Sequence, residues 1–381
     1  MLAERKSACC GCSACEQICP TGAVSMEEDE EGFVYPKIND TMCIHCNKCD
    51  TICAFSKKLY QKNELNEPDA YALKHKNLEI RLNSRSGGCF TALSDYILHL
   101  GGIIYGCGYG QDFEVVHKRA ENKEERDEFR GSKYVQSNTE GIFEKVRNDL
   151  KEGKYVLFSG TSCQVAGLKG FLGKIPQETL YCVDILCHGV PSPMVWRDYL
   201  MFMKKRYHGM VTEVDFRNKK QFGWKKHIET IRIGGNSHNS TIYKKLFYSH
   251  YILRPSCYEC PYKQMTHPAD ITLADFWGIQ KAVKNFNDNK GVSLVLINSI
   301  KGRELFEQVK EDTIYEKCKV RPEFQRPLHQ AFPMPEDRME FWKSYRRKGF
   351  YQIAIDCGGL SRKKYWKEQI SYCKKKLKKW L

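Results

Sequence analysis

The sequence contains no run of about 18 apolar residues, the length that a membrane-spanning helix requires. Its first residues, MLAERKSACCGC, lack the apolar segment of a secretory signal peptide. The 19 cysteines in 381 residues are about 5% of the chain, below the roughly 8–10% typical of a short secreted disulfide scaffold, and their number is odd. We therefore expect a cytoplasmic, reduced protein, in which crowded cysteines indicate metal or redox chemistry.

Acidic residues are fewer than basic ones, 46 against 61, and the formal net charge is +15. The excess is concentrated in residues 361–381, where nine basic residues stand against the single acid Glu368 and the net charge is +8. The rest of the chain carries only +7. Cluster-bound thiolates would lower the net charge further. We therefore expect no nucleic-acid partner, because such proteins usually present a broad basic surface.

The C-terminal segment, residues 336–381, is predicted to be a basic helical tail. Trp366, Ile370, Cys373 and Leu377 recur at helical spacing opposite the lysines, a pattern that Trp380 and Leu381 continue. A basic amphipathic helix can lie on the anionic inner face of a membrane or dock on a partner. The alternative is a helix that packs on its own domain with a solvated lysine face.

An internal repeat occupies residues 1–58. Two copies of the spacing C-x2-C-x2-C-x3-C lie 34 residues apart, and three thiolates on such a loop can hold one [4Fe-4S] cluster while the fourth reaches the neighbouring cluster. The expected ligand sets are therefore crossed: Cys9, Cys12, Cys15 and Cys53 for one cluster, and Cys43, Cys46, Cys49 and Cys19 for the other. Two zinc sites are the alternative, although zinc prefers separated C-x2-C pairs. Cys10 is left over as a bystander thiol.

Beyond a short hairpin expected within residues 24–40 and a polar linker at 59–69, apolar runs alternate with helical patterns. This alternation predicts a mixed α/β region, in parts 70–150 and 151–335, after a bacterial-type 2[4Fe-4S] ferredoxin domain. The expected strands are Ala70–Lys74, Ile103–Gly106, Val156–Ser159, Tyr181–Leu186, Val211–Arg217, Thr230–Ile233 and Val292–Asn298. The expected helices are Phe90–Leu100, Glu140–Leu150, Gln164–Leu172, Met194–Tyr207 and Gly302–Lys310.

Three turns in this region precede predicted helices. The first, Ser84 to Thr91, contains Gly87 and Gly88 and could either bind an anion at the helix start or serve only as a helix cap. The second presents Cys163 and the third contains Cys187 and His188, which together could form a cysteine–histidine hydrolase pair. The stretch 106–110 is glycine-rich, but its spacing is not that of a dinucleotide fingerprint.

A different interpretation of the two single cysteines includes a C-x2-C pair further along the chain. Cys163, Cys187, Cys257 and Cys260 supply the four thiolates that a third [4Fe-4S] cluster needs. Zinc and plain buried thiols are the alternatives to this cluster.

Five ordered motifs resemble the coenzyme F420 hydrogenase/dehydrogenase beta-subunit family over roughly residues 70–305. They are GTSCQVAGL from Gly160, CHGVPS from Cys187, the C-x2-C-P loop from Cys257, DITLADFWG from Asp270, and D-x-KGVSL from Asp288. The resemblance implies an FAD-binding α/β subunit with its own [4Fe-4S] cluster, in which the flavin exchanges a hydride with a substrate. It also strengthens the third-cluster assignment.

The same resemblance implies a set of flavin-binding residues. They are Arg85, Ser86, Gly87, Gly88, Thr91, Gly160, Thr161, Ser162, Gln164, His188, Gly189, Val190, Asp275 and Lys290. A lysine or histidine near the N1–C2 edge of a flavin would stabilise its reduced anion, so His188 and Lys290 are the candidate catalytic residues. A surface ion pair for Lys290 and a capped helix start for His188 are the alternatives.

We therefore expect an iron–sulfur flavoprotein oxidoreductase with three [4Fe-4S] clusters and FAD. Its partners would be an electron donor or acceptor, such as a ferredoxin or a redox enzyme, and a deazaflavin or another small-molecule substrate. The alternative is an electron-transfer subunit that docks on another enzyme and has no organic substrate of its own. A zinc-dependent regulatory or nucleic-acid-binding protein is a third interpretation, which predicts zinc in place of iron.

Overall fold

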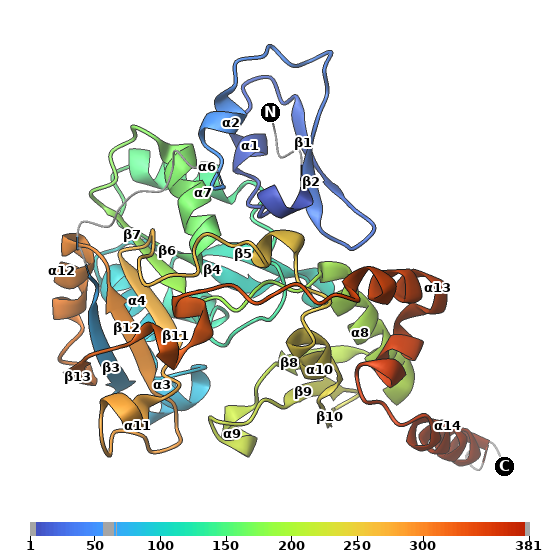
Figure 1. The fold of residues 1–381 in the computed structure, drawn as a ribbon. Helices are drawn as coiled ribbons and strands as arrows, with labels where there is room; N and C mark the ends of the chain where they lie inside the picture. The colour runs from blue at the N-terminus through green and yellow to red at the C-terminus, as the bar shows by residue number, and fades with distance from the viewer. Residues whose placement is uncertain (1–4, 56–64, 66, 378–381) are drawn as a thin grey trace.

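The computed structural model describes residues 5–55, 65 and 67–377. Figure 1 shows an N-terminal region, drawn in blue, above a long mixed sheet, with a smaller sheet and the C-terminal helices beside it. The mixed α/β class expected from the sequence is confirmed. The predicted domain boundaries stay predictions, and most of the predicted linker lies outside the described residues.

The N-terminal region consists of short helices around one hairpin. Its elements are η1 (Lys6–Ala8), α1 (Ala14–Gln17), β1 (Val24–Glu28), β2 (Val34–Ile38) and α2 (Lys48–Thr51). The two strands pair antiparallel, and the Asp29 carboxylate closes the turn by accepting hydrogen bonds from the backbone N–H groups of Glu31 and Phe33. The hairpin predicted between the two cysteine repeats is therefore confirmed.

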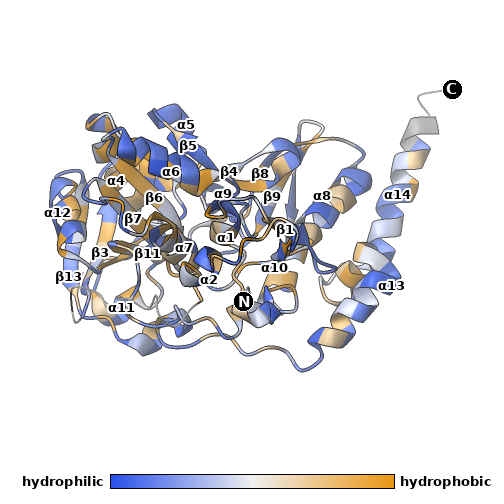
Figure 2. Cartoon of the chain, turned by 90° about the horizontal axis from the view of Figure 1, so that it is seen from above, coloured by the Kyte–Doolittle hydropathy of each residue, from blue (hydrophilic) through white to orange (hydrophobic). Residues whose placement is uncertain are grey.

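An eight-stranded sheet forms the centre of the α/β region, in the order β13-β3-β12-β11-β7-β6-β4-β5. The strands are β3 (Asp69–His75), β4 (Ile103–Tyr109), β5 (Val115–Ala120), β6 (Val156–Thr161), β7 (Leu180–Ile185), β11 (Ile271–Asp275), β12 (Ser293–Ile297) and β13 (Thr313–Cys318). The run β4-β6-β7-β11 is parallel, and the strands on either side of it are antiparallel. The central strands are among the most hydrophobic parts of the chain in Figure 2.

Helices cover both faces of this sheet because successive strand residues point to opposite sides. Leu157 packs on the face covered by α4 (Cys89–His99) and α12 (Ile300–Gln308), whereas its neighbour Phe158 packs on the face covered by α6 (Ile142–Lys151) and α7 (Ser162–Leu172). Two shorter helices, α3 (Leu78–Asn83) and α5 (Lys123–Asp127), lie beside β3 and β5.

Seven predicted strands are confirmed within a few residues, but the sequence analysis missed β5, β11, β13 and β10 (Asn236–Ser240). The predicted strand Ile103–Gly106 is also too short, because β4 continues to Tyr109. The side chain of Phe129 lies across this strand, and a Cβ atom on Gly106 would be 2.6 Å from its ring. The glycines there therefore serve packing rather than a phosphate turn.

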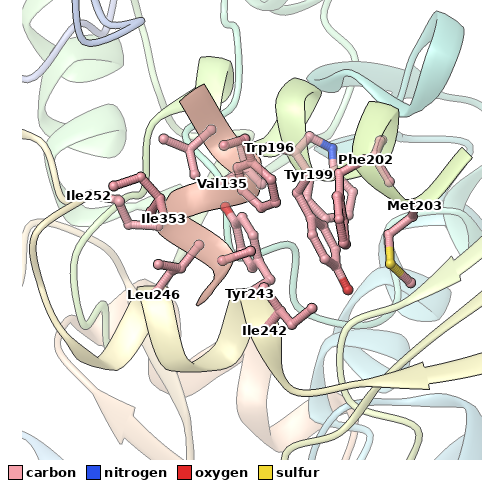
Figure 3. Packing of buried hydrophobic residues seen from close by; sticks show 14 of the residues in the cluster. Val135, Trp196, Tyr199, Phe202, Met203, Ile242, Tyr243, Leu246, Ile252 and Ile353 are labelled. Atoms are coloured by element: carbon pink, nitrogen blue, oxygen red, sulfur yellow. The ribbon is translucent and has the colours of Figure 1, made fainter. Parts of the chain in front are cut away.

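A second core, called here the small-sheet region, lies beside the main sheet. It contains β8 (Val211–Asp215), β9 (Glu229–Ile233) and β10 (Asn236–Ser240), with α8 (Pro193–Tyr207), α9 (Lys219–Phe222), α10 (Ile242–Tyr248) and α13 (Arg338–Asp356). Aromatic side chains fill it: Trp196, Tyr199 and Tyr243 are buried and lie with their rings in contact (Figure 3). The remaining short elements are η3 (Gln111–Phe113), η4 (Pro255–Cys257), α11 (Ile279–Ala282), η5 (Pro322–Phe324) and η6 (Arg326–Leu328).

The N-terminal region packs directly on the α6–α7 face of the main sheet. Cys12 and Ala54 belong to the same buried apolar cluster as Phe143 and Phe158. The Tyr262 hydroxyl donates a hydrogen bond to the carbonyl of Ala54. The cysteine loops are therefore held against the α/β region by a shared core.

The last helix, α14 (Arg362–Leu377), lies at the C-terminal end of the ribbon in Figure 1. It contacts α8 through polar and aromatic side chains. Glu368 forms an ion pair with Arg206 at 2.8 Å, and the ring of Tyr372 stacks on that of His208. The side chains of Trp366 and Ile370, in contrast, are more than half exposed. The predicted helix is present, and its apolar stripe faces away from the packed side. No helix within the described residues is long and apolar enough to cross a membrane.

Candidate iron–sulfur and flavin site

The cysteines of the first repeat are buried or half-buried. Burial, and after it the neighbouring thiols of Cys12, Cys9 and Cys53, raises the pKa of Cys15. Cys53 comes from the second repeat, so a cysteine of each repeat lies near Cys15, as the crossed set expected for one cluster requires. The backbone N–H of Gly11 donates to the sulfur of Cys9 at 3.4 Å, a contact that stabilises a thiolate ligand.

The cysteines of the second repeat lie closer to solvent. Cys46 is exposed, and the side chains of Met42 and Ile44 beside it are exposed as well. Burial raises the pKa of Cys49, and the thiols of Cys19 and Cys46 add to this effect. Three members of the second crossed set, Cys19, Cys46 and Cys49, therefore lie near one another.

The four remaining candidate ligands line one cavity between the N-terminal region and the main sheet. Cys163 lies in the first turn of α7, and Cys187 follows β7. Cys257 and Cys260 lie on the loop around η4. Cys10 and Phe55 of the N-terminal region line the same cavity. The donor set is four thiols on a largely apolar wall, which fits an iron–sulfur cluster.

Cys163 lies at the start of α7, where the helix dipole favours a thiolate. A hydrogen bond from Cys10 lowers the pKa of Cys163 to about 7, and Thr161 together with the charges of Lys263 and Arg254 acts in the same direction against burial. The Thr161 hydroxyl is 3.2 Å from the Cys163 sulfur. The backbone N–H of Val190 donates to Cys257 at 3.4 Å, so the sulfurs of Cys163 and Cys257 both have hydrogen-bonding partners outside the cysteine set.

A second cavity, of about 250 Å³, opens between the loop before α4 and the small-sheet region. Arg85, Arg217 and Lys219 line it together with Lys220 and Arg232. This basic cavity also has the carboxylates of Glu213 and Asp215 in its wall, which leaves a net positive lining suited to an anionic ligand. Burial lowers the pKa of Lys219 to about 7.

Asp275 joins the two arginines of the basic cavity. Its carboxylate lies 3.2 Å from Arg85 and 3.4 Å from Arg217, and it accepts a hydrogen bond from the indole of Trp224 at 2.7 Å. Asp275 was expected to contact the flavin; it also fixes the position of Arg85, another expected contact.

Two buried donors of this cavity have no hydrogen-bond partner among the described residues. They are Nη1 of Arg85 and Nε of Arg217. An unpaired buried donor costs about 1–3 kcal/mol, so two of them in one place indicate a ligand with acceptor atoms. The donor set therefore fits a flavin nucleotide. The cavity is smaller than the roughly 300–1,000 Å³ of most small-molecule sites, so only part of such a cofactor would fill it.

Other expected flavin residues of the first turn are engaged within the protein. The Ser86 hydroxyl donates to the carbonyl of Val292, and the backbone N–H of Gly87 donates to the Ser293 hydroxyl at 2.9 Å. Gly88 caps α4 in a left-handed conformation, and the Thr91 hydroxyl accepts from Arg130. Ser86 and Gly87 therefore hold the turn against the start of β12, and Arg85 is the expected residue of this turn that reaches the basic cavity.

The remaining expected residues divide between the two cavities and the surface. Thr161 and Gln164 form the capping box of α7, and Gly160 precedes Thr161, the last residue of β6. Ser162, Gly189 and Val190 line the third-cluster cavity. Lys290 is exposed, and its backbone N–H donates to Asp288.

His188 lies at the centre of a group of rings rather than beside Cys163. Its Nε2 atom is 2.8 Å from that of His250, and its ring stacks on Phe332 with the centroids 3.9 Å apart. Tyr248 contacts both His188 and His227, whose ring in turn lies against Tyr134. The hydrolase pair has no support in these contacts. Instead, a continuous row of rings connects the residue after Cys187 with the basic cavity.

Comparison with known proteins defines two stretches of the chain. Residues 153–323 match the family model for the C terminus of the coenzyme F420 hydrogenase/dehydrogenase beta subunit, and residues 8–57 match that of a 4Fe-4S dicluster domain. The chain therefore joins a stretch similar to a 4Fe-4S dicluster domain to a stretch similar to the C terminus of the F420 hydrogenase/dehydrogenase beta subunit. The resemblance seen in the sequence motifs is confirmed. No curated protein matches the chain.

Among solved structures, the protein is similar to a chain in the F420-reducing [NiFe] hydrogenase complex from Methanosarcina barkeri. The sequence identity is 18%, the TM-score is 0.48, and the match covers 67% of this chain and 84% of the other.

All four cysteines of the third set fall within the beta-subunit match, whereas the turn from Ser84 to Thr91 lies outside it. Within the described residues, no three His, Cys, Asp or Glu side chains lie close enough to hold one metal ion.

Sequence reasoning missed Arg217, His227 and Trp224 around the basic cavity, and Arg254 beside the cysteines. Arg217 ends an expected strand, and Arg254 stands three residues before the C-x2-C pair, so position near a motif was the available signal.

Proposed function

We propose that the chain is an iron–sulfur flavoprotein oxidoreductase that couples FAD-mediated hydride transfer to one-electron transfer through three [4Fe-4S] clusters. The observation that carries the proposal is the cavity lined by Cys163, Cys187, Cys257 and Cys260, because residues of the ferredoxin-type region form part of its wall. The beta-subunit and dicluster matches support iron–sulfur electron transfer.

The position of each cysteine set favours one electron route. The set containing Cys46 is nearest to solvent, so a one-electron partner such as a ferredoxin or a redox enzyme would exchange electrons there. The set containing Cys12 is buried against α7, next to the cavity of the third set. The row of rings from His188 to Tyr134 then leads toward the basic cavity.

When bound, FAD would exchange two electrons as a hydride with a small-molecule substrate and single electrons with the clusters. Arg85 and Arg217 would bind its acidic part, and Asp275 would keep both guanidinium groups in position. Lys219 lines the same cavity, where a bound anion would favour its protonated form.

The second candidate is an electron-transfer subunit without its own organic substrate. The two candidates differ in what the basic cavity does. An open cavity beside the bound flavin would admit a substrate such as a deazaflavin, whereas a cavity filled by the cofactor would leave only the exposed cysteine loop for exchange with a partner.

The test is the cofactor content of protein purified without oxygen. Near twelve iron and twelve acid-labile sulfide with one FAD per chain are expected from the assigned ligand sets. Near eight iron would exclude the third cluster, absence of flavin would exclude hydride transfer through FAD, and zinc in place of iron would exclude the redox function. Rapid reduction of the flavin by a deazaflavin or nicotinamide substrate would favour the enzyme over the relay.

A further inference from the structure

Arg254 is a completely buried cation between the cysteines of two proposed clusters. Its Nε donates to the carbonyl of Cys9 at 2.7 Å, and one Nη lies 3.5 Å from the Cys9 sulfur. The same side chain lines the cavity formed by the third cysteine set. Its backbone carbonyl accepts a hydrogen bond from the N–H of Cys257 at 2.9 Å. Arg254 therefore contacts one cysteine set and borders the other.

No carboxylate lies within ion-pair distance of Arg254 among the described residues. Its other partners are the neutral carbonyl of Val34 at 2.8 Å and the side-chain oxygen of Gln136 at 3.0 Å, and its guanidinium lies 4.3 Å from the centre of the Tyr35 ring. A buried charge without a counter-charge costs several kcal/mol. The sulfur of Cys9, which is within 3.5 Å of its guanidinium, would be a thiolate when a cluster is bound and would then supply the counter-charge.

The backbone of the first cysteine loop leaves space for this side chain. Gly11 has a φ of +66°, and a Cβ atom there would lie 2.7 Å from an Nη of Arg254. Gln136, which accepts from Arg254, donates through its amide nitrogen to the carbonyl of Cys10 at 3.0 Å. The first cysteine loop and the Arg254 side chain are therefore closely packed and linked through Gln136.

We propose that Arg254 is a shared counter-ion of the two buried clusters and holds their reduction potentials above the potential they would have without it. This inference rests on the proposed function, because it requires clusters at both cysteine sets. Reduction adds one negative charge to a cluster, and a fixed positive charge at short range stabilises the reduced form more than the oxidised form. The exposed cluster should be affected least, because none of the contacts that the structure describes for Arg254 involves a cysteine of that set.

The relative size of the effect follows from the surroundings of each set. The third set has a second buried cation, Lys263, which donates to the carbonyl of Cys187. The first set has direct contact with Arg254 through Cys9. Removal of the Arg254 charge should therefore lower the potential of the first cluster more than that of the third.

The test is an EPR-monitored redox titration of the full chain with all clusters loaded. In Arg254→Gln the signal of the first cluster, assigned by its loss in Cys15→Ser, should move to a lower potential, and that of the exposed cluster should move least. Arg254→Lys, which keeps the charge, should stay closer to the wild type. Equal potentials in the Arg254→Gln and wild-type proteins would overturn the inference.

A matched control is Arg338→Gln. Arg338 is also buried and joins the N-terminal region to α13 through Glu31, but its described contacts include no cysteine. Its loss should weaken the packing without changing any cluster potential, and a similar shift in both variants would overturn the inference.

If Arg254→Gln loses its iron, the variant Gln136→Glu tests the inference instead. A carboxylate there would neutralise Arg254 in place and should lower the same potential, and an unchanged potential would contradict the inference. Wild-type protein without iron would instead refute the proposed function.

Discussion

Cys12 and Gly167 meet across the boundary between the ferredoxin-type region and α7. The sulfur of Cys12 lies 2.7 Å from the position that a Cβ atom would take on Gly167. A proposed cluster ligand therefore rests on the backbone of the helix whose first turn carries Cys163, a ligand of the next proposed cluster. Glycine at this helical position keeps the two cysteine sets close.

The first prediction concerns this contact. Gly167→Ala should push the cysteine loop away from α7 and lower the free energy of unfolding by about 1–3 kcal/mol, although alanine favours a helix. Thermal unfolding measures the loss, and flash reduction should show slower electron transfer from the ferredoxin-type clusters to the third. Unchanged stability and an unchanged transfer rate would show that the loop does not depend on this close approach.

The second prediction concerns removal of the metal. Because Cys46 is exposed while Cys12 is buried, a chelator should remove about four of twelve iron atoms from the oxidised protein in a fast phase. The remaining iron should leave slowly. Iron release followed with a coloured chelator measures both phases, and Cys46→Ser, which removes a ligand of the exposed set, should lack the fast one. A single phase for all the iron would contradict this order of exposure.

The third prediction concerns flavin binding. Arg217→Gln should weaken FAD binding by roughly 10- to 100-fold, because a hydrogen bond to a charged group contributes about 1.5–3 kcal/mol. Arg232→Gln is the matched control, since Arg232 lines the same cavity but its side chain is half exposed and pairs with Glu213. Fluorescence titration of flavin-free protein measures both constants. Equal weakening in the two variants would indicate a general charge effect rather than a specific contact.

The fourth prediction concerns acid stability. Burial, aided by the charge of Lys133, lowers the pKa of His117 to about 4, so its imidazole stays neutral in the folded protein while the unfolded chain binds a proton below about pH 6.5. The free energy of unfolding should therefore fall as the pH drops from about 6.5 to 4, by about 2–3 kcal/mol from this residue. Urea unfolding of wild-type protein and His117→Gln at several pH values measures the slope. The variant should have a shallower slope, and parallel curves would exclude His117 as a source.

The fifth prediction concerns the basic tail. Trp366 and Ile370 are exposed on α14, and Glu368 is paired with Arg206, so the exposed face is apolar and basic. The protein should sediment with vesicles that contain anionic lipid, and Trp366→Asp with Ile370→Asp should abolish this binding. Met339→Asp is the control, because Met339 is also exposed, on α13. Absence of binding in the wild type would favour the alternative of a helix that only packs on its own domain.

Local patterns account for much of what could be predicted. The repeated cysteine spacing predicted the ferredoxin-type N-terminal region, and apolar runs such as Val156–Ser159 predicted the central strands. Strands β5 and β13 were missed because they lie at the edges of the sheet, where residues such as Lys118 and Glu316 carry solvent-facing charge and weaken the apolar pattern. The site was also predicted only in part. The cysteines follow a recognisable spacing, whereas Arg217 and Arg254 belong to no motif.

The sequence by itself determined the ligand chemistry, because thiolates at C-x2-C-x2-C-x3-C spacing can wrap a cluster wherever the loop lies. Only the tertiary structure decided that Cys10 and Phe55 border the cavity of the third cysteine set, that one set is exposed and another buried, and that Arg254 lies between two sets. These relationships join residues more than a hundred positions apart. They depend on the packing of the hairpin and the cysteine loops on the α6–α7 face, which no local pattern encodes.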